Sequence, residues 1–218
     1  MSFNLIVSVL NQKGGSGKTT ISINLAGALR EDGFDVLLID ADPQASSIAW
    51  SEVRQLEPLF PVAGMAKKSL HKDLPKLASG YDVTIIDGCP RVNDIARAAI
   101  LASDLVLIPV QPSPFDVWAA DEIVRLIEEA QQYREGIRAA FVINRKIANT
   151  AIGRDVRQAF AEQPFPVLEE TIGQRVVFPE SGAQGLTVLE VQPGGMAANE
   201  IRDVADHILQ TYQPRRES

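Results

Sequence analysis

The chain has 218 residues, of which 45% are hydrophobic and 22% charged, and this composition predicts one compact soluble domain over residues 1–218. A formal net charge of −7 at pH 7 excludes a protein coated in positive charge, so any nucleic-acid surface must be local. No apolar run reaches the roughly 18 to 20 residues of a membrane-spanning helix, the N-terminus has no basic signal-peptide region, and the single cysteine, Cys89, excludes an internal disulfide. We therefore expect a cytoplasmic protein with no membrane partner.

Short β-branched runs alternate along the chain with longer segments of helical period. This pattern predicts an α/β fold with a mostly parallel central sheet flanked by helices on both faces. The expected strands are Leu5–Leu10, Val36–Asp40, Val83–Asp87, Leu105–Val110, Ala140–Asn144 and Val167–Glu169. The expected helices are Lys18–Glu31, Leu70–Ser79, Asp94–Ala102, Pro114–Tyr133, Ile152–Glu162 and Ala197–Tyr212. We expect Trp118, on the fourth of these helices, to lie in the core.

The first strand leads into a glycine-rich loop that is followed at once by an amphipathic helical pattern. In this strand, loop and helix order, glycines let the backbone wrap closely around a triphosphate, and the helix dipole adds positive charge. Lys18 can reach the β- and γ-phosphates, and the Thr19 hydroxyl can ligate Mg²⁺. Gln12 stands where the standard G-x-x-x-x-G-K-[ST] pattern has its first glycine. The residues expected to bind nucleotide are Gly14, Gly15, Ser16, Gly17, Lys18, Thr19 and Thr20.

The segment Lys13-Gly-Gly-Ser-Gly-Lys-Thr-Thr20 resembles the deviant Walker A motif of the ParA/MinD ATPases. The resemblance implies a P-loop NTPase that uses ATP and Mg²⁺. It also implies that Lys13 is the family's signature lysine, which reaches across an ATP-bound homodimer to phosphates held by the other subunit. A lysine supplied in this way stabilises charge that develops on the γ-phosphate.

Carboxylates end two of the expected strands. Asp40 and Asp42 lie in a segment that resembles the family's D-x-D-P-Q element, so Asp42 is expected to position the attacking water and Asp40 to lie near the metal. An aspartate at a strand end can instead cap the next helix, and that alternative stays open for each of the two. Asp87 ends a strand that resembles Walker B and is expected to hold Mg²⁺. Because ligands gather outside the carboxyl ends of parallel strands, these groups should meet at the phosphate loop.

Asn144 ends a later strand, where its amide has both a donor and an acceptor for an adenine edge. Asparagine also ends strands because it tolerates turns, so both interpretations stay open. The stretch Pro179–Gly185 resembles the loop that closes over the base in these ATPases.

The resemblance covers nearly the whole chain and is greatest to short ParA-type partition ATPases. It implies a nucleoid-associated ATPase that dimerises with ATP, binds DNA non-specifically and is released when a partner stimulates hydrolysis. The expected cargo is plasmid or chromosomal DNA with a centromere-binding partner. The alternative is a protein cargo, such as a chemotaxis cluster or a microcompartment, held by an adaptor. The candidate DNA contacts are Arg145, Lys146, Arg154, Arg157, Arg175, Arg215 and Arg216.

Related functions are disfavoured by single features. A nitrogenase-type iron protein needs two cysteines per subunit, and this chain has only Cys89. A MinD-type ATPase needs a basic amphipathic tail that targets membranes, whereas this sequence ends in a short polar stub. The expected phosphate-loop strand also begins within a few residues of Met1, so we expect no separate operator-binding domain.

Overall fold

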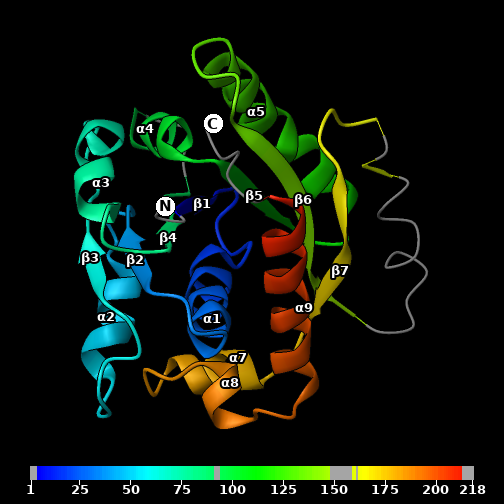
Figure 1. The fold of residues 1–218 in the computed structure, drawn as a ribbon. Helices are drawn as coiled ribbons and strands as arrows, with labels where there is room; N and C mark the ends of the chain where they lie inside the picture. Colours follow the sequence, from blue (N-terminus) through cyan, green and yellow to red (C-terminus); the bar gives the residue numbers. More distant parts are fainter. Residues whose placement is uncertain (1–3, 91–93, 148–158, 161, 213–218) are drawn as a thin grey trace.

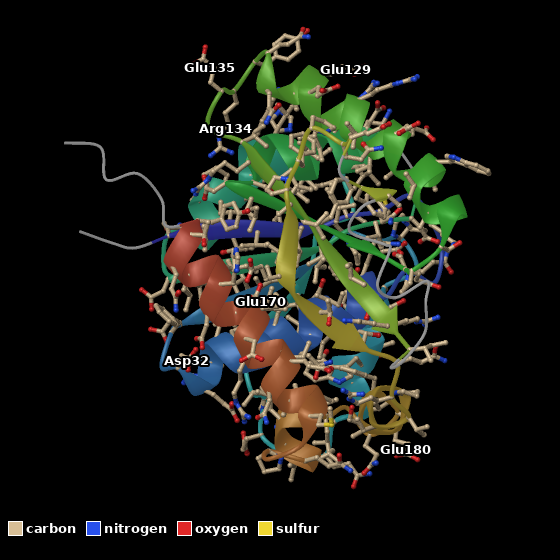
Figure 2. All side chains as sticks on the ribbon, turned by 90° about the vertical axis from the view of Figure 1, so that its right-hand side faces the viewer. Asp32, Glu129, Arg134, Glu135, Glu170 and Glu180 are labelled. Carbon is tan, nitrogen blue, oxygen red and sulfur yellow. The ribbon has the colours of Figure 1, made fainter. Side chains whose placement is uncertain are left out.

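The computed structural model describes residues 4–90, 94–147, 159–160 and 162–212 (Figure 1). Its centre is a seven-stranded sheet in the order β3-β2-β4-β1-β5-β6-β7, and every pairing in it is parallel. The strands are β1 Leu5–Val9, β2 Val36–Asp40, β3 Val62–Gly64, β4 Val83–Asp87, β5 Leu105–Val110, β6 Arg138–Lys146 and β7 Val167–Gly173. The described helices are α1 Lys18–Glu31, α2 Ser46–Val53, α3 Leu70–Ala78, α4 Asp94–Ala102, α5 Pro114–Gln131, α7 Val177–Gly182, α8 Val188–Val191 and α9 Met196–Thr211. The expected α/β fold is confirmed.

Each face of the sheet has its own hydrophobic core, and β1 shows why. Side chains alternate between the two faces of a strand, so Val7 and Val9 join one cluster while Ile6 joins the other. Helices α1, α8 and α9 cover the first face, and α1 and α9 stand side by side there (Figure 1). Helices α3, α4 and α5 cover the second face. The core strands are buried on both faces, which explains their nearly continuous apolar sequences.

The strand order determines where on the sheet a ligand is expected to bind. Strand β1 lies between β4 and β5, so the chain leaves β1 on one side for β2, β3 and β4 and on the other for β5, β6 and β7. The register pairs Val9 with Asp87 and with Leu107, so the carboxyl ends of these strands lie level with one another. Ligands of open α/β sheets bind at such a reversal of strand order. The loop after β1 therefore opens into the expected crevice.

Several short elements were not predicted. Helix α2, strand β3 and helix α8 have eight, three and four residues, which is too few to show a clear apolar period. Helix α7 lies on the segment Pro179–Gly185, which was expected to be a loop. Pro179 fits there because the first turn of a helix does not need its N–H group. Most of the expected helix Ile152–Glu162 lies outside the described residues.

The prediction that Trp118 is a core residue is wrong. Trp118 lies on α5 with 68% of its surface exposed, whereas Ala120 and Ile123 on the same helix are buried. The apolar face of α5 that packs on the sheet is narrow, and Trp118 lies outside this face. Across the described residues, no helix combines the length and the apolar character needed to cross a membrane.

Candidate nucleotide-binding site

The glycine-rich loop connects the centre of the sheet to the N-terminus of α1. Gly15 and Gly17 have φ angles of +76° and +95°, the left-handed region in which glycine is favoured. Gly17 is the N-cap residue of α1, and no side chain caps this end of the helix. Among the described residues, the buried hydroxyl of Ser16 has no hydrogen-bond partner. An uncapped helix N-terminus with an unused hydroxyl beside it suits an anion.

Two residues of the loop anchor it to the β5–α5 side of the sheet. Asn11 Nδ2 donates to the Pro109 carbonyl at 2.7 Å, and Asn11 Oδ1 accepts the backbone N–H of Lys13 at 3.0 Å. Gln12 Nε2 donates to the Ala119 carbonyl on α5 at 2.6 Å. The side chain that replaces the first glycine of the standard pattern therefore ties the loop to a helix, which sequence reasoning did not foresee.

Lys18 begins α1 and is buried, with only 7% of its surface exposed. Its Nζ lies 3.4 Å from the Lys13 carbonyl. Burial lowers the pKa of Lys18, and the charges of Asp87 and Asp42 partly offset that effect. A buried ammonium in this position is stabilised by negative charge that enters the loop, as phosphates would supply.

Asp87 lies at the carboxyl end of β4 and is fully buried. The Ser47 hydroxyl donates to Asp87 Oδ2 at 2.8 Å, and the Ser22 hydroxyl lies 3.5 Å from Asp87 Oδ1. Burial raises the pKa of Asp87 to about 7, although hydrogen bonds from Ser47 and Thr19 act in the opposite direction. Thr19 and Asp87, both expected at the metal, therefore lie close together. A carboxylate desolvated in this way gains stability when a cation binds to it.

Asp40 and Asp42 have different environments. Asp40 is buried, and its Oδ2 accepts the backbone N–H groups of Ser47 at 2.9 Å and Ile48 at 3.1 Å. Its Oδ1 accepts the N–H of Asp42 at 3.0 Å. Asp40 thus satisfies donors in the first turn of α2, which is the helix-capping alternative. Asp42 is half-buried, and its charge raises the pKa of Lys18.

A cavity of about 280 Å³ lies beside the loop at the carboxyl ends of β6 and β7. Its lining residues are Gly17, Thr20, Asn144, Arg145, Gly173, Gln174, Arg175, Phe178 and Pro179. Asn144 is buried at its wall, and its Nδ2 donates to the Ser16 carbonyl at 2.7 Å. Asn144 Oδ1 accepts the backbone N–H of Arg145 at 2.8 Å. Asn144 therefore holds the loop, and each half of its amide keeps further hydrogen-bonding capacity.

A second cavity, of about 410 Å³, lies between α1, α2 and α7, and sequence reasoning did not predict it. It shares Thr20, Phe178 and Pro179 with the first cavity. Trp50, in its wall, donates its indole N–H to the Leu186 carbonyl at 3.2 Å. Helix α7, on the segment expected to close over the base, thus separates two hollows beside the loop.

Three of the candidate DNA contacts lie in or near the first of these cavities, at the ends of β6 and β7. Arg145 is exposed at its rim with a left-handed φ of +54°, and Lys146 is half-buried in the β6–β7 pairing. Arg175 makes an ion pair with Glu200 and is largely covered. The remaining four lie outside the described residues: Arg154, Arg157, Arg215 and Arg216.

Lys13 does not share the surroundings of Lys18. Its Nζ lies 2.6 Å from Asp116 Oδ2 on α5, and 36% of its side chain is exposed whereas the Asp116 side chain is fully buried. Asp116 Oδ1 accepts the backbone N–H of Gln111 at 3.1 Å. The two lysines therefore point to different strands, with Lys18 associated with the β2 and β4 carboxylates and Lys13 with the β5–α5 connection.

Comparisons with known proteins show which proteins this chain is similar to. The maintenance of carboxysome distribution protein A of Halothiobacillus neapolitanus is 30% identical over 208 residues, which cover 93% of this chain and 95% of that protein. The chromosome-partitioning ATPase Soj of Thermus thermophilus is 28% identical over 245 residues, covering 95% and 96%. The fold matches the septum site-determining protein MinD of Pyrococcus horikoshii complexed with Mg-ADP, with a TM-score of 0.77, 19% identity and coverage of 97% and 99%. A family model described as the CobQ/CobB/MinD/ParA nucleotide binding domain matches residues 7–188, and the chain belongs to this family.

Proposed function

We propose that the chain binds and hydrolyses Mg-ATP and uses the nucleotide to switch between a monomer and a dimer that positions a cargo in the cell. The observation that carries this proposal is the loop itself. It presents an uncapped helix N-terminus and the buried Lys18 at the centre of the sheet edge, with Asp87 and Asp42 acting on that lysine. Positive groups for phosphate and carboxylates for a metal thus meet in one place.

The residues at this place fit a magnesium ion. Thr19 and Asp87 would hold it, and their mutual hydrogen bond already brings them together. In the described part of the chain, no three His, Cys, Asp or Glu side chains form a metal site of their own. The remaining ligands would come from phosphates and water, as is usual for Mg²⁺. When bound, the ion would neutralise charge on the β- and γ-phosphates.

Different residues of the chain would perform different steps of ATP hydrolysis. Lys18 would bind the phosphates, and Asp42, the more accessible of the two β2 carboxylates, would orient the attacking water. Asp40 would shape the site from outside, because its Oδ2 accepts two N–H groups of α2 and its Oδ1 accepts the N–H of Asp42. Lys13 would reach the phosphates of a second subunit and stabilise the developing charge.

The dimer would bind DNA without sequence preference through a local basic patch, because the net charge of −7 opposes general attraction to DNA. Arg145 supports such a patch, since it is exposed at the cavity beside the phosphate loop. Pairing two subunits doubles the number of cations in register. A partner protein that stimulates hydrolysis would then release the dimer.

Two cargoes remain candidates. Plasmid or chromosomal DNA is the cargo expected from the sequence, and the similarity to Soj, named as a chromosome-partitioning ATPase, supports it. A protein assembly is supported by the similarity to the carboxysome distribution protein of H. neapolitanus. The two cargoes are distinguished by fluorescently labelling the plasmids of the host cell and the candidate protein assemblies. Deleting the gene for this chain should disturb the cellular distribution of the true cargo and leave that of the other unchanged.

The ATPase proposal is tested with Lys18→Ala. We expect this variant to lose nucleotide binding measured by calorimetry and ATP turnover measured by phosphate release. Lys72→Ala, an exposed lysine on α3, is the matched control and should behave as wild type. Wild-type turnover in Lys18→Ala would refute the proposal.

DNA binding is tested by mobility shifts on unrelated duplexes with ATP and with ADP at rising salt. A shift that needs neither ATP nor low salt would contradict the switch.

A further inference from the structure

A stretch of ten residues, 67–76, carries four of the seven lysines of the chain: Lys67, Lys68, Lys72 and Lys76. It runs from the loop after β3 into α3, and its single acidic residue is Asp73. All four lysines are exposed. In a chain of net charge −7, these four side chains form a local basic surface, which we call the α3 patch. The candidate DNA contacts chosen from the sequence do not include it.

The helical period of α3 determines where two of these lysines point. Leu70, Leu74 and Ala78 follow one another at intervals of four residues and are buried in the hydrophobic core. Lys72 and Lys76 are also four residues apart, and they lie on the opposite side of the helix from the buried positions. No ion pair among the described residues includes either lysine. Both ammonium groups can therefore meet an anion from solvent.

The other two lysines make ion pairs at the surface. Lys67 Nζ lies 2.9 Å from Asp73 Oδ2, and Lys68 Nζ lies 2.5 Å from Asp94 Oδ2 at the start of α4. The side chains of Lys67 and Lys68 are 52% and 78% exposed, so water and salt screen both pairs. A phosphate that displaces either carboxylate has only a small cost to offset.

The α3 patch begins at the same edge of the sheet as the nucleotide site. Strand β3 pairs with β2 so that Gly64 lies opposite Asp40, and the N–H of Met65 donates to the Asp40 carbonyl at 2.7 Å. The N–H of Lys67 then donates to the Met65 carbonyl at 2.9 Å. Figure 1 shows α3 at the outer border of the molecule, at the end of the sheet remote from β7. The patch thus faces solvent and is joined by its backbone to the strand that carries the carboxylates of the nucleotide site.

We propose that the α3 patch is the surface through which the ATP-bound dimer binds the phosphate backbone of duplex DNA. This inference rests on the proposed DNA binding of the dimer and names its surface. Lysine ammonium groups contact phosphates as point charges and read no base sequence, so the binding has no sequence preference. One subunit offers four cations, whereas a dimer presents two such patches and gains affinity through avidity. Dimerisation with ATP then controls DNA binding without a change within the patch.

An anionic membrane is the other partner that clustered lysines can attract. Helices that lie on membranes insert an apolar face among the lipids. The apolar residues Leu70 and Leu74 of α3 are instead buried in the protein core, and among the large apolar residues of this helix only Leu77 is exposed, at 40%. The surface of α3 therefore favours DNA.

The proposal is tested with the double variant Lys72→Gln, Lys76→Gln. Its dissociation constant for an unrelated duplex, measured by fluorescence anisotropy with a slowly hydrolysed ATP analogue, should rise by at least about tenfold. The slope of log affinity against log salt concentration should become shallower by about 0.9 for each phosphate contact that is lost. The matched control is Arg30→Gln, Arg125→Gln, which removes the same charge from exposed positions on α1 and α5. It should keep the wild-type affinity and slope.

The outcomes separate the surface from the proposed function. If wild type shows no ATP-dependent binding to the duplex, the proposed DNA binding fails and the assignment of its surface fails with it. If wild type binds and the α3 double variant binds equally well, or loses no more affinity than the control, only the α3 patch is refuted. Ultracentrifugation with the same analogue should show wild-type dimerisation in the α3 variant, and a loss of the dimer would contradict the proposal. Binding of wild type to vesicles containing phosphatidylserine, but not to DNA, would assign the patch to membranes and overturn the proposal.

Lysine acetylation of the unmodified chain gives an independent readout. The chain with the ATP analogue is treated with limiting acetic anhydride, with and without DNA, and the modified lysines are quantified by mass spectrometry. DNA should lower the modification of Lys72 and Lys76 severalfold. Lys18 serves as the internal control, because nucleotide is present in both samples. Protection of Lys146 in place of the α3 lysines would put DNA at the ends of β6 and β7, and the proposal would be wrong.

Discussion

Ser47 connects the ends of two strands, because its backbone N–H donates to Asp40 at 2.9 Å and its hydroxyl donates to Asp87 at 2.8 Å. Asp40 ends β2 and Asp87 ends β4, and the register pairs the two aspartates across the sheet. The first turn of α2 thus lies against both carboxylates. If Asp87 binds the metal as proposed, a change at its carboxylate can be transmitted to α2 through Ser47.

The different surroundings of Asp40 and Asp42 give the first prediction. Asp40→Ala removes the acceptor of the Ser47 and Ile48 N–H groups, so the free energy of unfolding should fall by about 1 to 3 kcal/mol. Asp42→Ala should change it by less than about 0.5 kcal/mol because Asp42 is only half-buried, yet it should abolish ATP turnover. Urea denaturation and phosphate release separate the two effects. Equal losses of stability in both variants would contradict the assignment of Asp40 to α2.

Asp87 gives a prediction about pH. Its pKa is raised from 3.8 to about 7 in the folded chain, so between these values the native state binds more protons than the unfolded state. The contribution of Asp87 to stability must therefore fall as the pH rises from about 4 to about 7, by up to about 1.4 kcal/mol per pH unit. Outside this window it should be constant.

The effect is isolated by comparison with Asp87→Asn in the nucleotide-free protein. Urea denaturation at pH 5, 6, 7 and 8 should show the stability of wild type falling relative to the variant up to pH 7 and then levelling. A difference that does not depend on pH would mean that Asp87 is ionised throughout. In wild type, Mg²⁺ should also bind more weakly below pH 7, because protons compete for Asp87.

Sequence reasoning found the parts of this site that lie next to strand ends. Asp87 and Lys18 were predicted because buried strands and a glycine loop mark their positions, and the parallel register then brings them together. Asp116 could not be linked to Lys13 in this way, because only the placement of β5 beside β1 brings α5 to the loop. The capping role of Asp40 depended on α2, which is too short to show a helical period.

Gly17 gives a prediction about the loop. An added Cβ there would lie 2.1 Å from Asn144 Nδ2, and the φ of +95° is unfavourable for alanine. Gly17→Ala should therefore displace Asn144 from the Ser16 carbonyl and lower the free energy of unfolding by about 1 to 3 kcal/mol. Gly14→Ala is the control, because a Cβ at Gly14 meets nothing within 4 Å. Thermal unfolding of the nucleotide-free variants measures both, and similar losses would show that the Asn144 contact is not what restricts position 17.

The last prediction concerns the connection between α2 and α8. The side chain of Arg54 is 6% exposed, and its Nη2 lies 2.7 Å from Glu190 Oε1 while its Nη1 donates to the Gly185 carbonyl at 3.0 Å. Glu190 also accepts the backbone N–H of Thr187, so one carboxylate orders both Arg54 and the start of α8. Removing Arg54 takes this cation away from Glu190, whose side chain is 24% exposed.

Arg54→Ala should therefore lower the free energy of unfolding by about 2 to 3 kcal/mol. Arg30→Ala is the control, because the Arg30–Asp35 pair is exposed on both sides and should contribute no more than about 1 kcal/mol. Both values are measured by urea denaturation at low and high salt. The Arg54 effect should resist salt, since burial limits screening, while the Arg30 effect should vanish. If the two losses are equal, the α2–α8 connection adds nothing beyond a surface ion pair.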